Sequence, residues 1–474
     1  MVEIRKEVPF LEEIYLILKE QFPDLSENGI LCIVLSKIAQ IATSKRIQYK
    51  EIQRIKSPNI YSIAFILSGG GKDRLYDVLD KHMFSFYNEW FDEKANEYVC
   101  NKQKENKEYK TSKNEKGVTI QEQNIEIRYP VAEVENGTQE GLFEDAKILE
   151  DAKFGSLFVK ISELGLYLEY SQYMNMQFLS TLFNGYDGKI SSKSIKNGKR
   201  EKSIKNLPIN CLLFSDPTMF QSISLREKFN MLMQTGLGRR AFIVFQPNKT
   251  RHIEYDADIA YQKEKEFYIQ CEKINKKFKE IFEAIPMYGI YEQTQEAYKE
   301  ALHPYIIKLK ELEEKTENNL LAKEIRSREL KAIKVSCLLA SLNHPKDLHI
   351  YKKDMLQAIE LVDKLSKDIK EFINYRQKTD DHYDKLWQFF LDNTGIGFMR
   401  TNLIYQQYHH FGLSRDKFKD RFDDYIEAIK EMATDKGYFL DVKTVNHNSG
   451  KMYTLLKIEE SPLAEDTISL EEML

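Results

Sequence analysis

The chain is organised around one stretch, Phe65-Ile66-Leu67-Ser68-Gly69-Gly70-Gly71-Lys72-Asp73-Arg74. An apolar run from Ile63 to Leu67 precedes the glycines and predicts a short buried strand. An amphipathic pattern from Leu75 to Trp90 follows the lysine and predicts a long helix. Glycines let backbone N–H groups approach an anion closely, and a helix N-terminus adds free donors and a favourable dipole. The stretch therefore predicts a phosphate-binding loop in which the Lys72 ammonium reaches the terminal phosphates.

This loop matches only part of the P-loop pattern, which requires Gly, four residues, Gly-Lys and then Ser or Thr. Gly71-Lys72 fits the second half of the pattern. Ile66 occupies the position of the first glycine, and Asp73 replaces the hydroxyl residue that normally ligates magnesium. Asp73 would either hold the metal itself or repel the phosphate. The alternative interpretation is a glycine turn between a core strand and a helix, with a solvated Lys72.

The composition is that of a globular chain: 474 residues, of which 42% are hydrophobic and 30% charged. This length allows about two to four domains, and the net charge of −4 neither requires nor excludes nucleic acid. The five cysteines form no CxxC pair, which argues against a zinc knuckle or a disulfide framework. No signal-peptide pattern follows Met1, and no apolar run approaches the ~20 residues that span a bilayer. We therefore expect a cytoplasmic protein with no membrane partner.

A second apolar strand is predicted between Gly155 and Gly165, and a carboxylate, Glu163, stands at its end. P-loop ATPases place an acid at such a strand end to hold magnesium or to polarise the attacking water. Ser162 stands where an aspartate usually precedes that acid, which favours the water-polarising role. The alternative is an ordinary glutamate at a strand end. Asp73 and Glu163 are the candidate magnesium ligands.

Two more strands complete the predicted core. The first, Ile209 to Phe214, ends at Ser215, a position suited to sensing the γ-phosphate. A glycine turn then precedes Arg239, Arg240 and a fourth strand. Paired arginines suit stabilisation of transition-state charge, as an arginine finger or a phosphate sensor, and the alternative is a salt bridge to a nearby carboxylate. The predicted nucleotide-binding residues are Ser68, Gly69, Gly70, Gly71, Lys72, Asp73 and Ser215.

A basic segment from Lys189 to Lys205 contains a single acid, Glu201. Asn197-Gly198, flanked by Ile195 and Ile204, predicts a hairpin turn. A basic hairpin suits contacts to phosphodiesters, which require positive charge rather than base reading. The alternative is a solvated loop. The residues predicted to contact DNA are Lys193, Lys196, Lys199, Arg200 and Lys202.

The rest of the chain is predicted to be mainly helical. Ile125 to Tyr129 alternates as a strand does, Thr138 is placed as the N-cap of a short helix, and Glu292 to Leu321 is expected to form one helix. Near the C-terminus, three helices over residues 383–434 precede two strands over 437–456, a pattern typical of a winged helix. The expected domains are a helical cap (1–57), an α/β core (58–250), a helical domain (251–378), a winged helix (379–460) and an acidic tail (461–474).

Taken in order, these motifs resemble an uncharacterised family of P-loop ATPases associated with primases and with replication of prophages, plasmids and other mobile elements. The matching pieces are Leu67 to Asp73, Gly137 to Leu142, Phe158 to Gly165, Tyr186 to Gly188, Leu212 to Pro217 and Gly236 to Phe242. The resemblance implies an α/β fold with a RecA-like or AAA-type core, a sheet flanked by helices, and ATP and magnesium as cofactors. It also implies that Lys72 is the phosphate lysine, Glu163 the catalytic acid, and Arg239 or Arg240 the finger acting on a neighbour's nucleotide.

The leading hypothesis is an ATP-dependent, helicase-like DNA motor or replication initiator of a mobile element, assembled as an oligomeric ring. Its expected partners are single-stranded DNA at the basic hairpin, duplex DNA or a protein at the winged helix, and a primase or other replication protein. The departures at Ile66, Asp73 and Ser162 motivate a second hypothesis, a DNA-binding or scaffold protein that kept the fold and lost hydrolysis. A third hypothesis is a regulator that acts only through the winged helix. A metalloenzyme is not expected, because the nine histidines are scattered.

Overall fold

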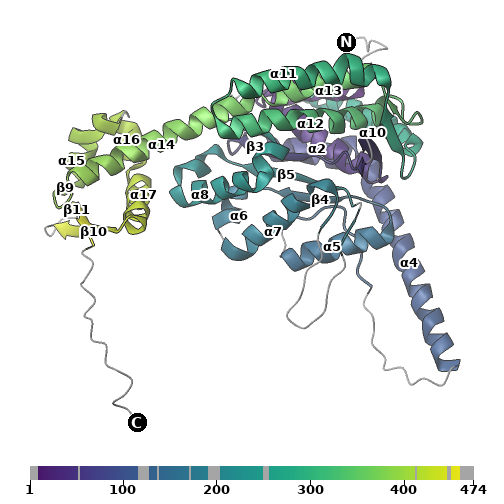
Figure 1. Ribbon diagram of the computed structural model, residues 1–474, viewed down its shortest axis with the longest axis horizontal. Coiled ribbons are helices and arrows are strands. Elements are labelled where there is room, and N and C mark those ends of the chain that lie inside the picture. Colours follow the sequence, from purple (N-terminus) through teal and green to yellow (C-terminus); the bar gives the residue numbers. More distant parts are fainter. Residues whose placement is uncertain are drawn as a thin grey trace. The chain divides into compact units, whose positions relative to one another are not determined.

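The structure is a computed structural model that forms two compact units (Figure 1). The core unit comprises Met1–Met219 and Lys228–Phe372, and the C-terminal unit comprises Phe220–Glu227 and Ile373–Leu474. The residues that the structure describes are 9–51, 54–115, 127–135, 138–169, 172–190, 203–205, 207–248, 256–411, 414–445 and 450–458.

Helices make up most of the described chain (Figure 1). The α-helices are α1 (Phe10–Gln21), α2 (Glu27–Thr43), α3 (Lys72–Val78), α4 (Ser85–Glu115), α5 (Gln139–Ala152), α6 (Leu164–Glu169), α7 (Gln172–Asn184), α8 (Ile223–Leu232), α9 (Gly238–Arg240), α10 (Ala257–Ala284), α11 (His303–Glu314), α12 (Asn319–Asn343), α13 (Lys352–Leu365), α14 (Asp368–Asp392), α15 (Arg400–Asn402), α16 (Arg415–Asp420) and α17 (Phe422–Asp435). The π and 3-10 turns are η1 (Leu79–Met83), η2 (Gly185–Asp187), η3 (Pro217–Gln221), η4 (Met233–Leu237), η5 (Ala297–Leu302), η6 (Leu403–Gln407) and η7 (Tyr408–Phe411).

A four-stranded parallel sheet in the order β4-β5-β3-β6 forms the centre of the core unit. Its strands are β3 (Tyr61–Ile66), β4 (Leu157–Ile161), β5 (Ile209–Ser215) and β6 (Phe242–Gln246). These are the four predicted core strands, and their nearly continuous burial is typical of a parallel sheet covered on both faces. Because β5 lies between β3 and β4, the glycines after β3 and Glu163 after β4 come from strands that are not neighbours.

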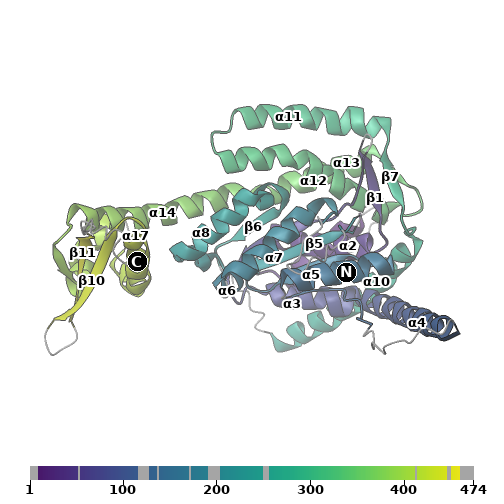
Figure 2. The same cartoon turned by 60° about the horizontal axis from the view of Figure 1, so that its bottom comes forward.

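Helices cover both faces of this sheet, which confirms the predicted mixed α/β class. α2 packs on one face, where Ser36 Oγ donates to Ser62 Oγ of β3 over 2.7 Å. α7 covers the opposite face, against Tyr61 (Figure 1). α11, α12 and α13 lie side by side (Figure 2). The middle helix, α12, buries every residue from 332 to 342, most of them apolar.

A second sheet joins the N-terminal part of the core unit to its helical part, in the order β2-β1-β7-β8. Its strands are β1 (Gln48–Glu51), β2 (Arg54–Lys56), β7 (Ile290–Gln293) and β8 (His349–Ile350). The prediction of one helix from Glu292 to Leu321 is therefore wrong. A strand opens this region, and a new helix, α12, begins where Asn318 Oδ1 accepts the backbone N–H groups of Leu320 and Leu321, each at 3.0 Å.

Two other local predictions are also wrong. The single helix expected after Lys72 is interrupted at Phe84, whose φ of −131° and ψ of 23° are not helical, and α4 begins anew beyond it. The predicted strand over Ile125–Tyr129 lies partly outside the described residues, and its described part, 127–129, forms no strand. The chain pairs with the sheet later instead, where Val134 bridges Val159 in parallel. The predicted N-cap is confirmed, since Thr138 Oγ1 accepts the Gly141 N–H at 3.1 Å.

The C-terminal unit follows the order helix, strand, helical segments and hairpin. Its antiparallel sheet has the order β10-β11-β9, from strands β9 (Gly397–Met399), β10 (Tyr438–Val445) and β11 (Gly450–Lys457). The two predicted strands are present, and β9 was not predicted. The last of the three predicted helices is divided into α16 and α17 at Arg421, whose φ of −110° and ψ of 10° are not helical. An aromatic and aliphatic core that includes Trp387, Phe390, Phe418, Phe422 and Ile429 holds these elements together.

A histidine–aspartate pair closes the turn between α12 and α13. His344 Nε2 lies 2.8 Å from Asp354 Oδ2, and this oxygen also accepts the backbone N–H of Tyr351 at 3.0 Å. The hydrogen bond to Asp354 raises the pKa of His344 above its usual value, and partial burial opposes this shift without cancelling it. The pair therefore fixes the first turn of α13.

We expect His344→Gln to destabilise the protein more at acidic than at alkaline pH. The pKa of His344 is raised above 6.5 in the folded chain, so its contribution is complete below the unfolded pKa and is lost as the pH rises through the folded pKa. Thermal unfolding of wild type and variant at about pH 5.5 and about pH 8.5 measures this difference. Asp354→Asn should abolish the same pH dependence, and an equal loss of stability at both pH values would contradict the prediction.

Candidate functional site

The glycine loop, residues 67–71, leaves the carboxyl end of β3 and leads into α3. Gly71 is the N-cap of α3 and has a φ of 88°, a left-handed conformation that favours glycine. A Cβ at Gly70 would lie 2.9 Å from the Leu67 carbonyl oxygen and 2.9 Å from the Ile66 side chain. The tight path of the loop therefore requires glycine at both positions, and Ile66 belongs to the buried strand rather than to the loop.

Lys72 is the first residue of α3 and is only 5% exposed, so the interpretation of a solvated lysine is wrong. Its Nζ lies 3.6 Å from Glu163 Oε2 and 5.8 Å from the centre of the Phe214 ring. This buried atom forms no hydrogen bond with any residue that the structure describes. Burying a charged donor without a hydrogen-bond partner is unfavourable, and such exceptions commonly mark a functional group or a missing ligand. Lys72 therefore makes the loop a candidate site for an anionic ligand.

Glu163 is held beside Lys72 by groups at the end of β5. Its Oε1 accepts the Ser215 hydroxyl at 2.8 Å and the Asp216 backbone N–H at 3.2 Å. Its Oε2 is the oxygen that lies closest to the Lys72 ammonium. The structure thus brings together three predicted site residues, Lys72, Glu163 and Ser215, from the ends of three different strands.

Asp216 also belongs to this site, although the sequence analysis did not select it. Its Oδ2 accepts the Ser68 backbone N–H at 2.7 Å, which ties the glycine loop to β5. Its Oδ1 accepts the backbone N–H and the hydroxyl of Thr218, at 2.9 and 2.7 Å. Partial burial favours a higher pKa for Asp216, but the hydrogen bonds from Thr218 and Ser68 outweigh it and hold the pKa below its usual value. The available signal was Asp216-Pro217-Thr218, the pattern of an Asx turn.

Asp73, the other predicted magnesium ligand, is exposed on the first turn of α3. Within the described ranges, no three His, Cys, Asp or Glu side chains are grouped to hold a metal ion. Magnesium in nucleotide sites takes one or two carboxylates and completes its shell with phosphate oxygens and water. Glu163 and Asp216 fit that smaller role, whereas Asp73 is suited to stabilising the helix dipole.

Arg239 and Arg240 lie at the opposite edge of the sheet from the glycine loop. They end α9 just before β6, and β6 runs parallel to β3 with Phe242 opposite Ser62. A strand of five residues spans about 16 Å, so the two arginines are far from the loop that follows β3. Within one chain, the two arginines and the glycine loop therefore lie at opposite ends of the strands.

The two arginines have different surroundings. Arg240 Nη1 donates to the Phe183 carbonyl oxygen at 2.7 Å, and its guanidinium lies 5.2 Å from the centre of the Tyr186 ring. Arg239 is exposed. In the part of the chain that the structure describes, neither arginine forms an ion pair, so the expected alternative of a salt bridge is not observed there.

The predicted DNA-binding hairpin is described only at its base. Ile190 and Ile204 pair in antiparallel fashion, with N–H to O distances of 3.1 and 3.0 Å, as expected for a hairpin that turns between them. The predicted contact residues lie outside the described residues: Lys193, Lys196, Lys199, Arg200 and Lys202.

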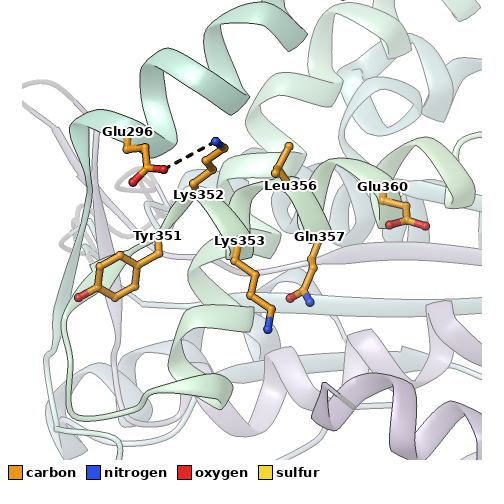
Figure 3. A pocket seen from close by; sticks show the side chains of 7 residues that line it. All are labelled: Glu296, Tyr351, Lys352, Lys353, Leu356, Gln357 and Glu360. Atoms are coloured by element: carbon orange, nitrogen blue, oxygen red, sulfur yellow. Dashed lines mark ion pairs between the residues drawn. The ribbon is translucent and has the colours of Figure 1, made fainter. Parts of the chain in front are cut away.

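A separate surface depression of about 490 Å³ lies against α13 (Figure 3). Its lining residues are Glu296, Tyr351, Lys352, Lys353, Leu356, Gln357 and Glu360. Lys352 Nζ lies 3.7 Å from Glu296 and 2.6 Å from Glu300, so its charge is already compensated. The depression is open to solvent and remote in sequence from the glycine loop, and it contains none of the predicted site residues.

Comparison with known proteins finds no matching family model and no matching curated protein. Within the described ranges, no helix is long and apolar enough to cross a membrane. The functional assignment therefore depends on the geometry of the loop, its buried lysine and the carboxylates beside it.

Proposed function

We propose that the protein is an ATP-dependent, helicase-like DNA motor or replication initiator with a P-loop NTPase core. The observation that carries this proposal is the buried Lys72 ammonium, which has no described hydrogen-bond partner and lies 3.6 Å from Glu163. The strand order supports it as well. In open parallel sheets, ligands bind at the carboxyl ends of the strands, where the glycine loop, Glu163 and Ser215 meet.

In this proposal, different groups of the chain bind the phosphates of ATP and activate the attacking water. The glycine loop and Lys72 hold the phosphates, as backbone donors and a buried cation suit. Ser215 orients Glu163, whose carboxylate accepts a proton from the attacking water. Glu163 or Asp216 would hold a magnesium ion, which would supply stabilisation of the phosphate charge.

The assembly is proposed to be head to tail. Because Arg239 lies at the opposite edge from the loop, it acts on the nucleotide of a neighbouring copy. Repeated contacts between unlike edges close into a ring or extend as a filament. Light scattering with ATP and DNA present tests this part of the proposal, and a protein that stays monomeric under those conditions contradicts it.

The experiment that tests the main proposal is ATP hydrolysis with and without single-stranded DNA. Turnover that rises with DNA supports a motor. A protein that binds nucleotide and DNA without turnover supports the second candidate, a DNA-binding scaffold that retains the fold. The exposed Asp73, at the position where a P-loop carries a magnesium-binding hydroxyl, is the observation that favours this second candidate.

The C-terminal unit is proposed to be a winged-helix module, on the basis of its element order and its sheet order β10-β11-β9. The exposed surface of α17, which takes the place of the recognition helix, is acidic. It presents Asp423, Asp424 and Glu427, and its half-exposed Lys430 pairs with Glu427 at 2.7 Å. Acidic side chains repel the DNA backbone, so α17 is poorly suited to enter a groove. The hairpin formed by β10 and β11 carries exposed lysines and is the better candidate for contact with duplex DNA.

We expect the double variant Lys443→Glu, Lys451→Glu to bind duplex DNA about tenfold or more weakly than wild type at low salt. Both lysines are exposed on the hairpin, so the substitutions should not disturb the core. Asp424→Lys on α17 is the matched variant and should bind duplex DNA as well as or better than wild type. Fluorescence anisotropy with a short duplex measures both. Unchanged binding by the double variant would indicate that this module binds a protein partner instead of duplex DNA.

A further inference from the structure

The two ends of the glycine loop are linked to each other through two carboxylates. At the start of the loop, the Ser68 backbone N–H donates to Asp216 Oδ2 at 2.7 Å. The Asp216 backbone N–H donates in turn to Glu163 Oε1 at 3.2 Å, and Glu163 Oε2 lies 3.6 Å from the ammonium of Lys72, which follows the loop. We call this continuous series of polar contacts the carboxylate bridge.

The loop is also closed by a contact within its own backbone. The Gly70 N–H donates to the Leu67 carbonyl oxygen at 3.0 Å, and Gly69, with a φ of 75°, takes the third position of this tight turn. Phosphate-binding loops act through backbone N–H groups that point at the anion. Here the N–H groups of Ser68 and Gly70 donate to oxygens of the protein. An anion that uses the Ser68 N–H must therefore displace Asp216 from it.

Asp216 is held in place from its other side by Thr218. Its Oδ1 accepts the Thr218 backbone N–H at 2.9 Å and the Thr218 hydroxyl at 2.7 Å. Pro217, between these two residues, is buried and has a restricted backbone. Because both carboxylate oxygens accept hydrogen bonds, the turn at 216–218 directs Oδ2 of Asp216 toward the glycine loop.

The charges of the carboxylate bridge do not cancel. Lys72 supplies one positive charge, and this charge lies beside Glu163. Within the described residues Asp216 forms no ion pair, and the groups of Ser68 and Thr218 that donate to it are neutral. A second anion beside an uncompensated carboxylate is repelled, more strongly in a partly buried site than in water. Of the two carboxylates, Asp216 is therefore the one that opposes an anionic ligand.

We infer that Asp216 competes with the nucleotide phosphates for the glycine loop and keeps the loop closed until they displace it. Its carboxylate takes the place of a phosphate oxygen at the Ser68 N–H. The inference rests on the proposed function and deepens it, because it names how occupancy of the same site is regulated. Removing a competing carboxylate strengthens the binding of a metal-free nucleotide, whereas removing a residue that only supports the loop weakens it.

The test measures ATP binding by isothermal titration calorimetry with EDTA present, so that only groups of the chain act on the phosphates. Asp216→Asn keeps the shape of the side chain and an oxygen for Ser68 but loses the charge, and Asp216→Ala loses both. Both variants should bind metal-free ATP about tenfold more tightly than wild type. Asp77→Asn is the matched control, because Asp77 is an exposed acid of α3 that pairs with Lys81 at 3.1 Å. This control should stay within about twofold of wild type.

A second readout follows the loop itself, as amide hydrogen exchange over residues 67–71 without ligand. Asp216→Ala should exchange about tenfold faster than wild type in this segment, because the Ser68 N–H loses its acceptor. Asp216→Asn should exchange nearly as slowly as wild type, since its amide oxygen still accepts. If Asp216→Ala does not fold, ATP binding by Asp216→Asn decides the question.

The outcomes separate the inference from the proposed function. Unchanged or weaker binding of metal-free ATP by Asp216→Asn would overturn the inference and leave the nucleotide site intact. If that variant lost affinity only when magnesium was added, Asp216 would be a metal ligand and not a competitor. If wild type and both variants bind no ATP with or without magnesium, the proposed nucleotide site fails together with the inference.

Discussion

Replacing Lys72 with methionine is expected to abolish the stabilisation of the protein by ATP and to lower ATP turnover by at least about 100-fold. In the proposed site, the buried Lys72 ammonium supplies a full positive charge to the phosphates. A charge in such a site acts through a lower effective dielectric constant than water, so its removal is costly to ligand binding. Thermal unfolding with and without ATP, together with turnover assays, measures both effects.

The same substitution should have only a small effect on the ligand-free protein. Lys72 Nζ has no described hydrogen-bond partner, and its ion pair with Glu163 is long, at 3.6 Å, so Lys72→Met should change the free energy of unfolding by no more than about 1 kcal/mol. Lys37 is the matched control, since its side chain is 2% exposed against 6% for Lys72. Its Nζ lies 2.6 Å from Asp80 and 3.2 Å from the Tyr76 hydroxyl, so Lys37→Met should destabilise the protein by about 3–5 kcal/mol.

This comparison separates a binding role from a structural one. If Lys72→Met unfolds as easily as Lys37→Met while ATP still protects the variant, Lys72 is part of the fold and not of a nucleotide site. A Lys72→Met variant that is as stable as wild type without ATP, but is not stabilised by ATP, supports the proposed site.

The second large effect is expected for Glu163→Gln, which should lower ATP turnover by roughly 100-fold or more while nucleotide binding persists. Glutamine keeps an oxygen that can accept from Ser215 and Asp216, so the local structure should survive. It removes the negative charge that polarises water. Single-turnover hydrolysis and nucleotide titration distinguish the chemical step from binding.

The control for this substitution is Glu169→Gln, at an exposed position at the end of α6, and its turnover should stay close to wild type. Loss of nucleotide affinity in Glu163→Gln, with turnover of the bound fraction preserved, would reassign Glu163. Its function would then be to hold the loop through Lys72 rather than to act on water.

The central sheet could be predicted because each strand is an apolar run followed by a turn or a polar residue. Short strands such as β9 could not be predicted in this way. β9 has three residues, all partly or fully exposed, so it leaves no hydrophobic period to detect. The interruption of the predicted helix at Phe84 could not be predicted either, because apolar residues continue through Phe84 and Phe86 as they would in one helix. At this break the Phe84 ring packs against Phe278, with ring centroids 5.0 Å apart.

The candidate site was predictable where it depends on strand ends. The carboxyl ends of parallel strands meet at one edge, which is why Lys72, Glu163 and Ser215 come together. The role of Asp216 depends on a turn whose geometry the residue types suggest only weakly. The sequence also could not separate Arg239 from Arg240, because adjacent helical residues point in different directions and only packing shows which one is held.

The insertion of β5 between β3 and β4 has a consequence for the newly made chain. Ile63 in the middle of β3 lies opposite Leu213 on one side and Ile243 on the other. Both edges of β3 therefore stay unpaired until β5 and β6 have been synthesised. Parallel pairing between distant segments is slow, and unpaired strand edges are prone to aggregate. We therefore expect the nascent N-terminal half to need protection on the ribosome. A fragment that stops before Ile209 carries the whole glycine loop but lacks β5 and Asp216, whose carboxylate ties that loop to the sheet.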